Sequence, residues 1–204
     1  LQPLQFAYSL LTRSLRITHE NLRTRDPAFV ERVERWYADK AGVAPVPGRR
    51  SPPPFLTPFK LRDLVLSNRV VVSPMCQYSA VDGVPNDWHL QHLASRAVGG
   101  EGLVMTKMTD VSAEGRITPG CTGMYTDAHL AGWKRIVDFV RRHTPDTRIG
   151  MQLGHAGRKA ATKLMWEGDN QPLPAGAWPI MSASAVPWKR ENQVPRAMTR
   201  GDME

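Results

Sequence analysis

The segment Arg69–Tyr78, R-V-V-V-S-P-M-C-Q-Y, joins a run of β-branched residues to a group of polar and reactive ones. β-Branched residues favour strands, and Pro74 has no amide hydrogen with which to continue one. We therefore predict a buried strand over Arg69–Ser73 that ends just before Cys76 and Tyr78. It is the first of three such segments.

Helical and strand-like patterns alternate after this segment. We predict a helix over Trp88–Val98, a strand over Leu103–Val111, a helix over Asp127–His143 and a strand over Arg148–Leu153. Asn86 or Asp87 caps the first helix, which Gly99–Gly100 stops, and Thr126 caps the second. The apolar face of the second helix comprises Leu130, Trp133, Ile136, Val137 and Val140. The alternation predicts parallel strands with helical crossovers, and hence an α/β layer or barrel.

A proline-rich stretch separates this pattern from the amino-terminal part. Five of the twelve residues in Val43–Pro54 are proline, so we expect an extended, semi-rigid linker. Before it, Phe6–Ile17 reads as helical, and Asp26 and Pro27 begin a second helix that Gly42 ends. Its predicted apolar face comprises Val30, Val33, Trp36 and Tyr37. About forty helical residues make a small core, which predicts the tail of a larger domain or an appendage.

The region after Ala160 loses all periodicity. Five prolines interrupt it, and it also contains Trp166, Trp178 and Trp188. An irregular stretch of roughly forty residues is usually a functional loop. The tryptophans either staple this loop or form a lid or pocket wall.

Length and composition exclude several classes of protein. The 204 residues suit one or two domains, and 23% charged with 41% hydrophobic residues is typical of a globular protein. We expect no membrane span, no secretory signal and a cytoplasmic location, because apolar runs are short and the two cysteines suit a reducing compartment. The net charge of +8 is spread along the chain, so we expect no nucleic-acid binding.

Polar groups follow each predicted strand, where ligands of parallel α/β proteins collect. They are Ser73–Tyr78, then Thr106–Asp110, then Gln152 with His155 and Arg158. A thiol, a phenol, a primary amide and an imidazole at converging strand ends predict a binding or catalytic site.

Five motifs stand in order along the chain: S-P-M-C-Q-Y-S (73–79), W-H-L-Q-H (88–92), R-A-V-G-G-E-G-L-V (96–104), G-R-I-T-P-G (115–120) and Q-L-G-H-A-G-R-K-A (152–160). Together they resemble the amino-terminal part of the Old Yellow Enzyme family, in particular its thermophilic-type NADH:flavin oxidoreductases, which carry a cysteine after S-P-M. The resemblance covers residues 55–204.

This resemblance implies the first three strands of a (β/α)8 TIM barrel that binds FMN and takes hydride from NADH or NADPH. By position, Ser73, Pro74, Met75 and Cys76 would lie along the flavin, with Cys76 adjusting its reduction potential. Tyr78 would face a small-molecule substrate, Met108 would line the ring, and Gln152 would meet the pyrimidine edge. An amide both donates and accepts hydrogen bonds, as that edge requires, and a thiol packs on a redox ring without fixing a charge.

The chain departs from the family pattern in two ways. At Lys107 and Met108 the family commonly has an acid and then a small residue. The histidines that clamp the substrate and the segments that bind the FMN phosphate have no counterpart. We therefore expect a fragment that is inactive by itself.

The amino-terminal residues 1–43 resemble the carboxyl-terminal helices of FAD-dependent aromatic-ring monooxygenases. The predicted organisation is thus a monooxygenase tail (1–43), a linker (44–54) and a truncated barrel (55–204). That order is similar to bifunctional enzymes acting on aromatic acyl-CoA thioesters, such as salicylyl-CoA 5-hydroxylase and 2-aminobenzoyl-CoA monooxygenase/reductase. It implies FAD in a missing domain and an acyl-CoA substrate, and leaves a homo-oligomer open.

Several of these residues, and the chain as a whole, also have alternative interpretations. A free cysteine such as Cys76 is often only a small buried residue. His89 and His92 could present two metal ligands, but capping or packing is the commoner role. His155 could be a base or a turn residue, and Gly154–Gly157 lacks the dinucleotide-binding pattern. The rival to an enzyme is a catalytically idle barrel that mediates contacts for the attached monooxygenase.

Overall fold

The structure is a computed structural model that describes residues 2–203. The chain forms two compact units. The first unit comprises the chain through Val71 together with 100–103 and 146–148, and the second comprises 72–99, 104–145 and the chain from Ile149 onward. The predicted domain boundaries near residues 43 and 54 stay a prediction.

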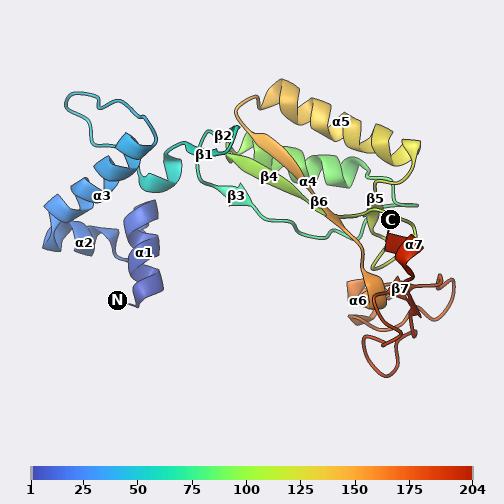
Figure 1. Cartoon of the computed structure of the whole chain (residues 1–204). Helices are drawn as coiled ribbons and strands as arrows, with labels where there is room; N and C mark the ends of the chain where they lie inside the picture. Colours follow the sequence, from blue (N-terminus) through green and yellow to red (C-terminus); the bar gives the residue numbers. More distant parts are fainter. Residues whose placement is uncertain (1, 204) are drawn as a thin grey trace. The chain divides into compact units, whose positions relative to one another are not determined.

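Three helices begin the first unit: α1 (Pro3–Thr12), α2 (His19–Arg25) and α3 (Pro27–Lys40) (Figure 1). The single helix predicted over Phe6–Ile17 is broken, because Arg13 adopts a left-handed conformation (φ 55°) and a short 3-10 turn, Leu15–Ile17, follows. The predicted cap of α3 is confirmed, since the Asp26 carboxylate accepts a hydrogen bond from the Phe29 amide at 2.8 Å.

The predicted apolar face of α3 is partly wrong. Trp36 is exposed, whereas Val30, Glu34 and Ala38 are buried. These three residues follow the i, i+4 spacing of one helical face, and Trp36 lies off it. The face that packs inward therefore carries a carboxylate at its centre.

The proline-rich stretch contains no helix or strand between residues 43 and 53, as predicted, but it is not fully extended. It turns where the Arg49 amide donates to the Val46 carbonyl at 3.0 Å. After a 3-10 turn at Pro54–Leu56, an unpredicted antiparallel hairpin pairs β1 (Phe59–Leu61) with β2 (Leu64–Leu66).

The second unit is built on β3 (Val71–Val72), α4 (Asp87–Val98), β4 (Leu103–Asp110), α5 (Asp127–His143) and β6 (Arg148–Gly154), in the predicted order. β4 is the central strand and pairs with β3 and β6, and near its end with the short β5 (Thr122–Gly123). β4 and β6 run in the same direction, because the Arg148 amide donates to Gly102 at one end and the Val111 amide donates to Gly154 at the other. The fold is therefore α/β.

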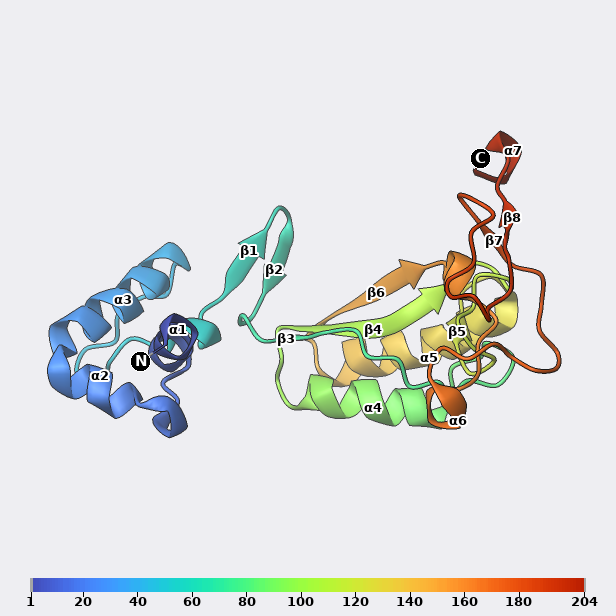
Figure 2. The ribbon, with the colours of Figure 1, turned by 90° about the horizontal axis from the view of Figure 1, so that it is seen from below.

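Both helices cover the same face of this sheet (Figure 2). The core between helices and sheet consists of Leu93, Ala97, Val104, Trp133, Ile136 and Val140, with Val72, Leu90, Ile149 and Met151 against it. The predicted caps are confirmed, since Asn86 accepts from the Trp88 amide and Thr126 accepts from the His129 amide. Leu130, predicted to face the core, is exposed instead.

The strand predicted over Arg69–Ser73 is shorter and less buried than expected. Only Val71 and Val72 form β3, and Val71 is exposed while Val72 packs on the core. β4 is the only strand paired with β3 among the described residues, so the other side of β3 gains no cover from a neighbouring strand.

The carboxyl-terminal region is largely irregular, as predicted. Its elements are short: a 3-10 turn at Gly157–Lys159, α6 (Met165–Gly168), the parallel pair β7 (Met181–Ser182) and β8 (Arg196–Ala197), and α7 (Arg200–Met203). Two of its tryptophans lie against cations: Trp178 against Arg116, and Trp188 against Arg158 and Lys159. The Trp178 indole also donates to the Glu114 carbonyl at 3.0 Å, so this residue staples the loop.

Candidate functional site

The carboxyl ends of β4 and β6 lie side by side on the second unit. Met108 on β4 packs directly over Gly154 on β6, and Gln152, two residues earlier on β6, is exposed. Side chains two residues apart on a strand share a face, so Gln152 lies on the same face as this contact. The opposite face carries Ile149 and Met151, which pack on the helices. Met108 and Gln152 thus share the face that α4 and α5 leave uncovered.

The burial pattern of β4 slips by one residue in the middle of the strand. Val104 and Thr106 are buried and alternate with half-buried neighbours, but Lys107 is buried as well, after which Met108 is again half-buried. The strand thus buries Lys107 next to Thr106 and leaves Met108 on the uncovered face.

Lys107 belongs to a buried polar cluster that also includes Tyr78, Asp110 and Cys121. The Lys107 ammonium is 5.5 Å from the centre of the Tyr78 ring. Neither the Lys107 Nζ nor either Asp110 carboxylate oxygen has a hydrogen-bond partner within residues 2–203. Burial raises the pKa of Asp110 to about 7, although the charge of Lys107 opposes the rise. Burial also raises the pKa of the Cys121 thiol.

Tyr78 is held in an unusual backbone conformation. Its φ is 47°, in the left-handed region that non-glycine residues seldom adopt. A side chain on Gly120 would collide with the Tyr78 carbonyl, since its Cβ would lie 2.3 Å from that oxygen. Burial, followed by the effect of Cys76, raises the pKa of Tyr78, so the phenol stays protonated at neutral pH. Cys76 itself is a half-buried free thiol.

The other predicted site residues follow β3. Ser73 and Met75 are exposed and Pro74 is half-buried. Their roles at a flavin stay predictions, as do those of Cys76 and Tyr78. Because β3, β4 and β6 are neighbours in one sheet, the three predicted groups of polar residues do adjoin strands of the same sheet.

The histidines have structural partners. The His89 Nδ1 accepts a hydrogen bond from the Asn86 amide at 3.2 Å and completes the capping box of α4. The His155 Nδ1 accepts from the Gly157 amide at 3.0 Å, which fits a turn residue. Within the described range, no group of three His, Cys, Asp or Glu side chains is placed to hold a metal ion.

Sequence reasoning missed the cluster around Lys107. The signal that could have found it is the strand T-K-M-T-D (106–110), in which polar residues interrupt the period of two. Two pairs of adjacent polar residues, Thr106 with Lys107 and Thr109 with Asp110, are buried in this strand.

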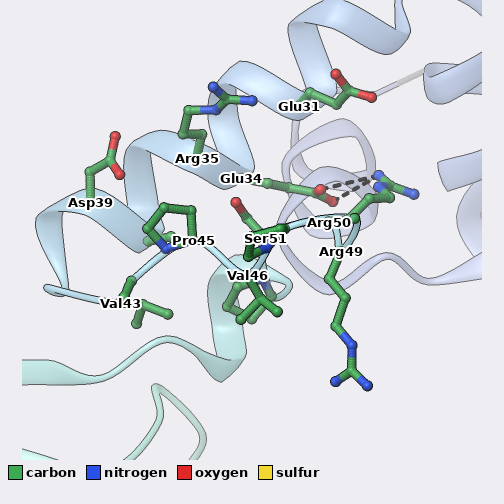
Figure 3. Close-up of a pocket in the computed structure, with 15 residues that line it drawn as sticks. Glu31, Glu34, Arg35, Asp39, Val43, Pro45, Val46, Arg49, Arg50 and Ser51 are labelled. Carbon is green, nitrogen blue, oxygen red and sulfur yellow. Dashed lines mark hydrogen bonds and ion pairs between the residues drawn. The ribbon is translucent and has the colours of Figure 1, made fainter.

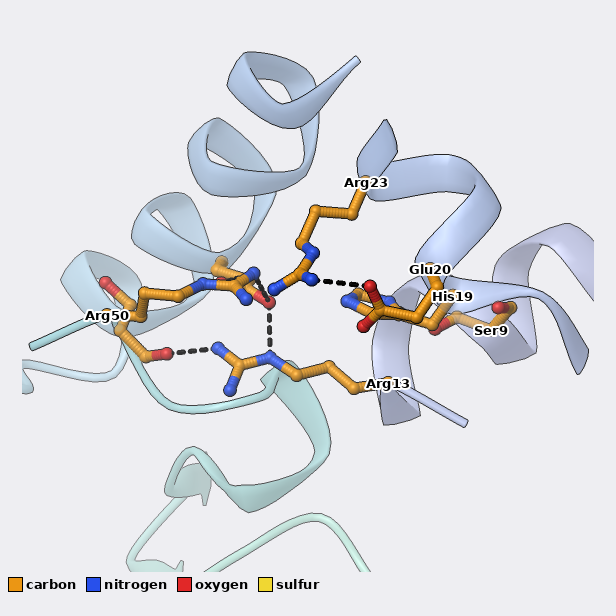
Figure 4. A network of polar contacts seen from close by, with 8 residues as sticks. Ser9, Arg13, His19, Glu20, Arg23 and Arg50 are labelled. Carbon is orange, nitrogen blue, oxygen red and sulfur yellow. Dashed lines mark hydrogen bonds and ion pairs between the residues drawn. The ribbon is translucent and has the colours of Figure 1, made fainter. Parts of the chain in front are cut away.

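Two hollows are lined by residues of the first unit. One, of about 910 Å³, lies between α3 and the stretch 43–52 (Figure 3). The buried Glu34 carboxylate beside it receives hydrogen bonds from Arg13 and Arg50, and Arg13 also donates to the Ser51 carbonyl (Figure 4). This network closes the stretch onto α3 and presents no free reactive group. The second hollow, of about 690 Å³, lies beside β1, Trp36 and Arg69.

None of the helices in residues 2–203 is both long and apolar enough to cross a membrane.

Comparisons with known proteins agree on one family for the second unit and the hairpin. Residues 54–204 match the model of the NADH:flavin oxidoreductase / NADH oxidase family. An NADH:flavin oxidoreductase of Gibberella zeae is 40% identical over 153 residues, which are 72% of this chain and 37% of the relative. An NADPH dehydrogenase of a Geobacillus species is 36% identical over 150 residues, covering 72% of this chain and 39% of the relative.

Solved structures give the same result. Morphinone reductase matches with a TM-score of 0.59 and 27% identity, over 73% of this chain and 40% of its own. The old yellow enzyme from Trypanosoma cruzi matches with a TM-score of 0.58 and 25% identity, over 73% and 43%. The chain thus spans about two fifths of the length of the relatives it matches.

Proposed function

This chain belongs to the NADH:flavin oxidoreductase / NADH oxidase family, and we propose on that basis that it contributes the first strands of an FMN-dependent oxidoreductase. Hydride would pass from NADH or NADPH to the flavin and then to a small-molecule acceptor. The observation that carries the proposal is the uncovered face at the ends of β4 and β6, where Met108 and the exposed Gln152 lie together.

The residues on this face fit a flavin. Met75 and Met108 offer flexible apolar contacts to a flat ring, and the exposed Gln152 carries a primary amide. That amide can meet the alternating donors and acceptors of the pyrimidine edge. In the proposal, Ser73, Pro74 and Cys76 complete the lining after β3.

The bound flavin would supply the hydride chemistry, and the protein would supply positioning and electronic tuning. Gln152 would orient the ring through its edge. Cys76, a half-buried thiol, would adjust the potential without placing a charge on the ring. Tyr78 would present its protonated phenol to the acceptor, since its raised pKa keeps the proton on the oxygen at neutral pH.

We extend the proposal to an aromatic or conjugated acyl-CoA thioester as acceptor, in a cytoplasmic protein that also carries an FAD-dependent ring hydroxylase. Its support is the sequence likeness of residues 1–43 to monooxygenase helices and the proline-rich stretch that follows. The alternative is an idle barrel that serves as an interaction module for the monooxygenase, and a homo-oligomer stays open.

The test is flavin binding by the native polypeptide in which this sequence occurs. We expect a yellow protein with flavin absorption that oxidises NADH or NADPH. Gln152→Leu should weaken FMN binding by about 1 to 3 kcal/mol, because a buried polar edge loses its partner. Cys76→Ala should shift the flavin midpoint potential and leave the fold intact.

Gln171→Leu is the matched control, since Gln171 is an exposed amide bound to the Lys163 side chain in the irregular region. A colourless polypeptide would favour the idle barrel. If FMN affinity is unchanged in Gln152→Leu and the flavin midpoint potential is unchanged in Cys76→Ala, the proposed roles of both residues at the flavin are wrong.

A further inference from the structure

Lys107 is a buried cation with no conventional partner. Only 3% of this lysine is exposed, and its Nζ makes no hydrogen bond within residues 2–203. A buried ammonium without compensation is costly. Its neighbour is the ring of Tyr78, whose centre lies 5.5 Å from the Nζ, within the range of a cation–π contact.

Asp110 is the complementary buried anion, three residues along the same strand. Its residue is fully buried, and both carboxylate oxygens lack hydrogen-bond partners in the described chain. Lys107 and Asp110 are close enough to influence one another, yet no ion pair of 4.0 Å or less joins them among the described residues. The ammonium therefore lies near two groups that attract it, the Tyr78 ring by direct contact and the Asp110 carboxylate by charge.

We propose that Lys107 is a positioning residue that fixes the ring of Tyr78, and that the charge of Asp110 controls how firmly it does so. The inference rests on the proposed function, because Tyr78 follows β3 in the segment that would line the flavin. With Asp110 neutral, the ammonium stays over the ring. With Asp110 ionised, the carboxylate draws the ammonium away and loosens Tyr78.

The surroundings allow this competition near neutral pH. Asp110 faces Lys107 on its own strand, Arg116 beyond the end of β4, and Cys121 and Tyr125 from the segment around β5. Burial raises the pKa of Asp110 to about 7 and also raises the pKa of Cys121 and of Tyr125, so these two neighbours stay neutral.

Lys107 and Tyr78 have a few further titratable neighbours. Lys107 also faces His89 on α4, whose pKa burial lowers to about 4, so that this imidazole is neutral above pH 5. Tyr78 faces Cys76, Cys121 and Asp169 in addition to Lys107. Between pH 5.5 and 8.5, Asp110 is thus the group beside Lys107 that changes charge.

The test follows the Tyr78 ring by 13C NMR in the native polypeptide labelled at tyrosine, with Tyr78→Phe to assign the signal. In the wild type, we expect the ring shift to move with pH with a midpoint near 7. Asp110→Asn should abolish this inflection, and Lys107→Met should both abolish it and displace the signal at all pH values. Lys107→Arg should restore it, because a guanidinium keeps the charge.

Lys189→Met is the control, since it removes the same charge from an exposed position. An inflection near pH 7 that persists in Asp110→Asn would overturn the proposal, and this variant decides it even where Lys107→Met does not fold. The measurement follows the Tyr78 ring itself and does not require bound flavin, so its result is independent of the proposed function.

A second measurement connects the pair to the site. FMN affinity at pH 6 should fall by about thirtyfold in Lys107→Met, the size of one desolvated cation–π contact, and Lys107→Arg should recover it. The wild type should bind FMN more tightly at pH 6 than at pH 8.5, and Asp110→Asn should not. An absence of all FMN binding would contradict the proposed function, whereas equal affinities in all variants would contradict the role of the pair.

Discussion

Met108 fills the space that a side chain at position 154 would need. A Cβ built on Gly154 would lie 2.6 Å from the Met108 Cγ and 2.8 Å from its Sδ. The large side chain on β4 and the missing one on β6 are therefore complementary.

Gly154→Ala should displace Met108 and destabilise the second unit by about 1 to 3 kcal/mol, the usual cost of overpacking. The double variant Gly154→Ala with Met108→Ala should recover part of this loss, because the collision is removed. Urea unfolding of the four members of this cycle measures the coupling. Purely additive effects would show that the two residues do not compete for space.

Glu34→Gln should loosen the first unit. The buried carboxylate is the shared acceptor of Arg13 and Arg50, whose side chains are 24% and 36% exposed, so solvent offsets part of the loss. We expect about 1 to 2 kcal/mol lower stability and faster amide hydrogen exchange over residues 43–52. Glu31→Gln, an exposed change on the same helix, should alter neither quantity. Equal exchange in the two variants would contradict a role for the network in holding this stretch.

Trp133→Phe should destabilise the core of the second unit. The buried indole donates a hydrogen bond to the Gly123 carbonyl at 3.0 Å, which ties α5 to β5. Phenylalanine leaves that carbonyl unpaired and a small void, at a cost of about 2 to 4 kcal/mol. Trp166→Phe, at an exposed tryptophan, serves as the control in thermal unfolding. Similar thermal unfolding midpoints for Trp133→Phe and Trp166→Phe would contradict a stabilising role for the hydrogen bond from Trp133 to Gly123.

His89 should make the protein acid-sensitive. Burial, with the charges of Lys107 and His92, lowers its pKa from 6.5 to about 4. The unfolded histidine therefore takes up a proton at a higher pH than the folded one, so stability is lost as the pH falls from 6.5 towards 4. The loss is on the order of 3 kcal/mol for a shift of this size.

His89→Gln should remove this loss while keeping the capping box, because glutamine is one of the residues that serve at this position. Unfolding free energies measured from pH 7.5 to 4.5 should therefore fall less steeply in the variant. Parallel curves for the variant and the wild type would exclude His89 as the source.

The order of elements in the second unit could be predicted from the sequence because its signals are local. Asn86 and Thr126 cap their helices through bonds to amides two or three residues away, and the apolar period of Asp127–His143 needs no distant partner. The ordered motifs likewise identified the family. The polar strand ends at residues 73–78, 106–110 and 152–158 could be found in the same way, since each lies within or just after the carboxyl-terminal part of a strand.

Only the tertiary structure decided which side chains are buried. The contact of Lys107 with the ring of Tyr78, the packing of Met108 against Gly154, and the convergence of Arg13 and Arg50 on Glu34 all join residues from separate segments. A period in the sequence says which residues share a face, but what covers that face depends on the elements packed against it. For this reason Trp36 and Leu130 are exposed despite their apolar pattern, while a lysine and two carboxylates lie inside.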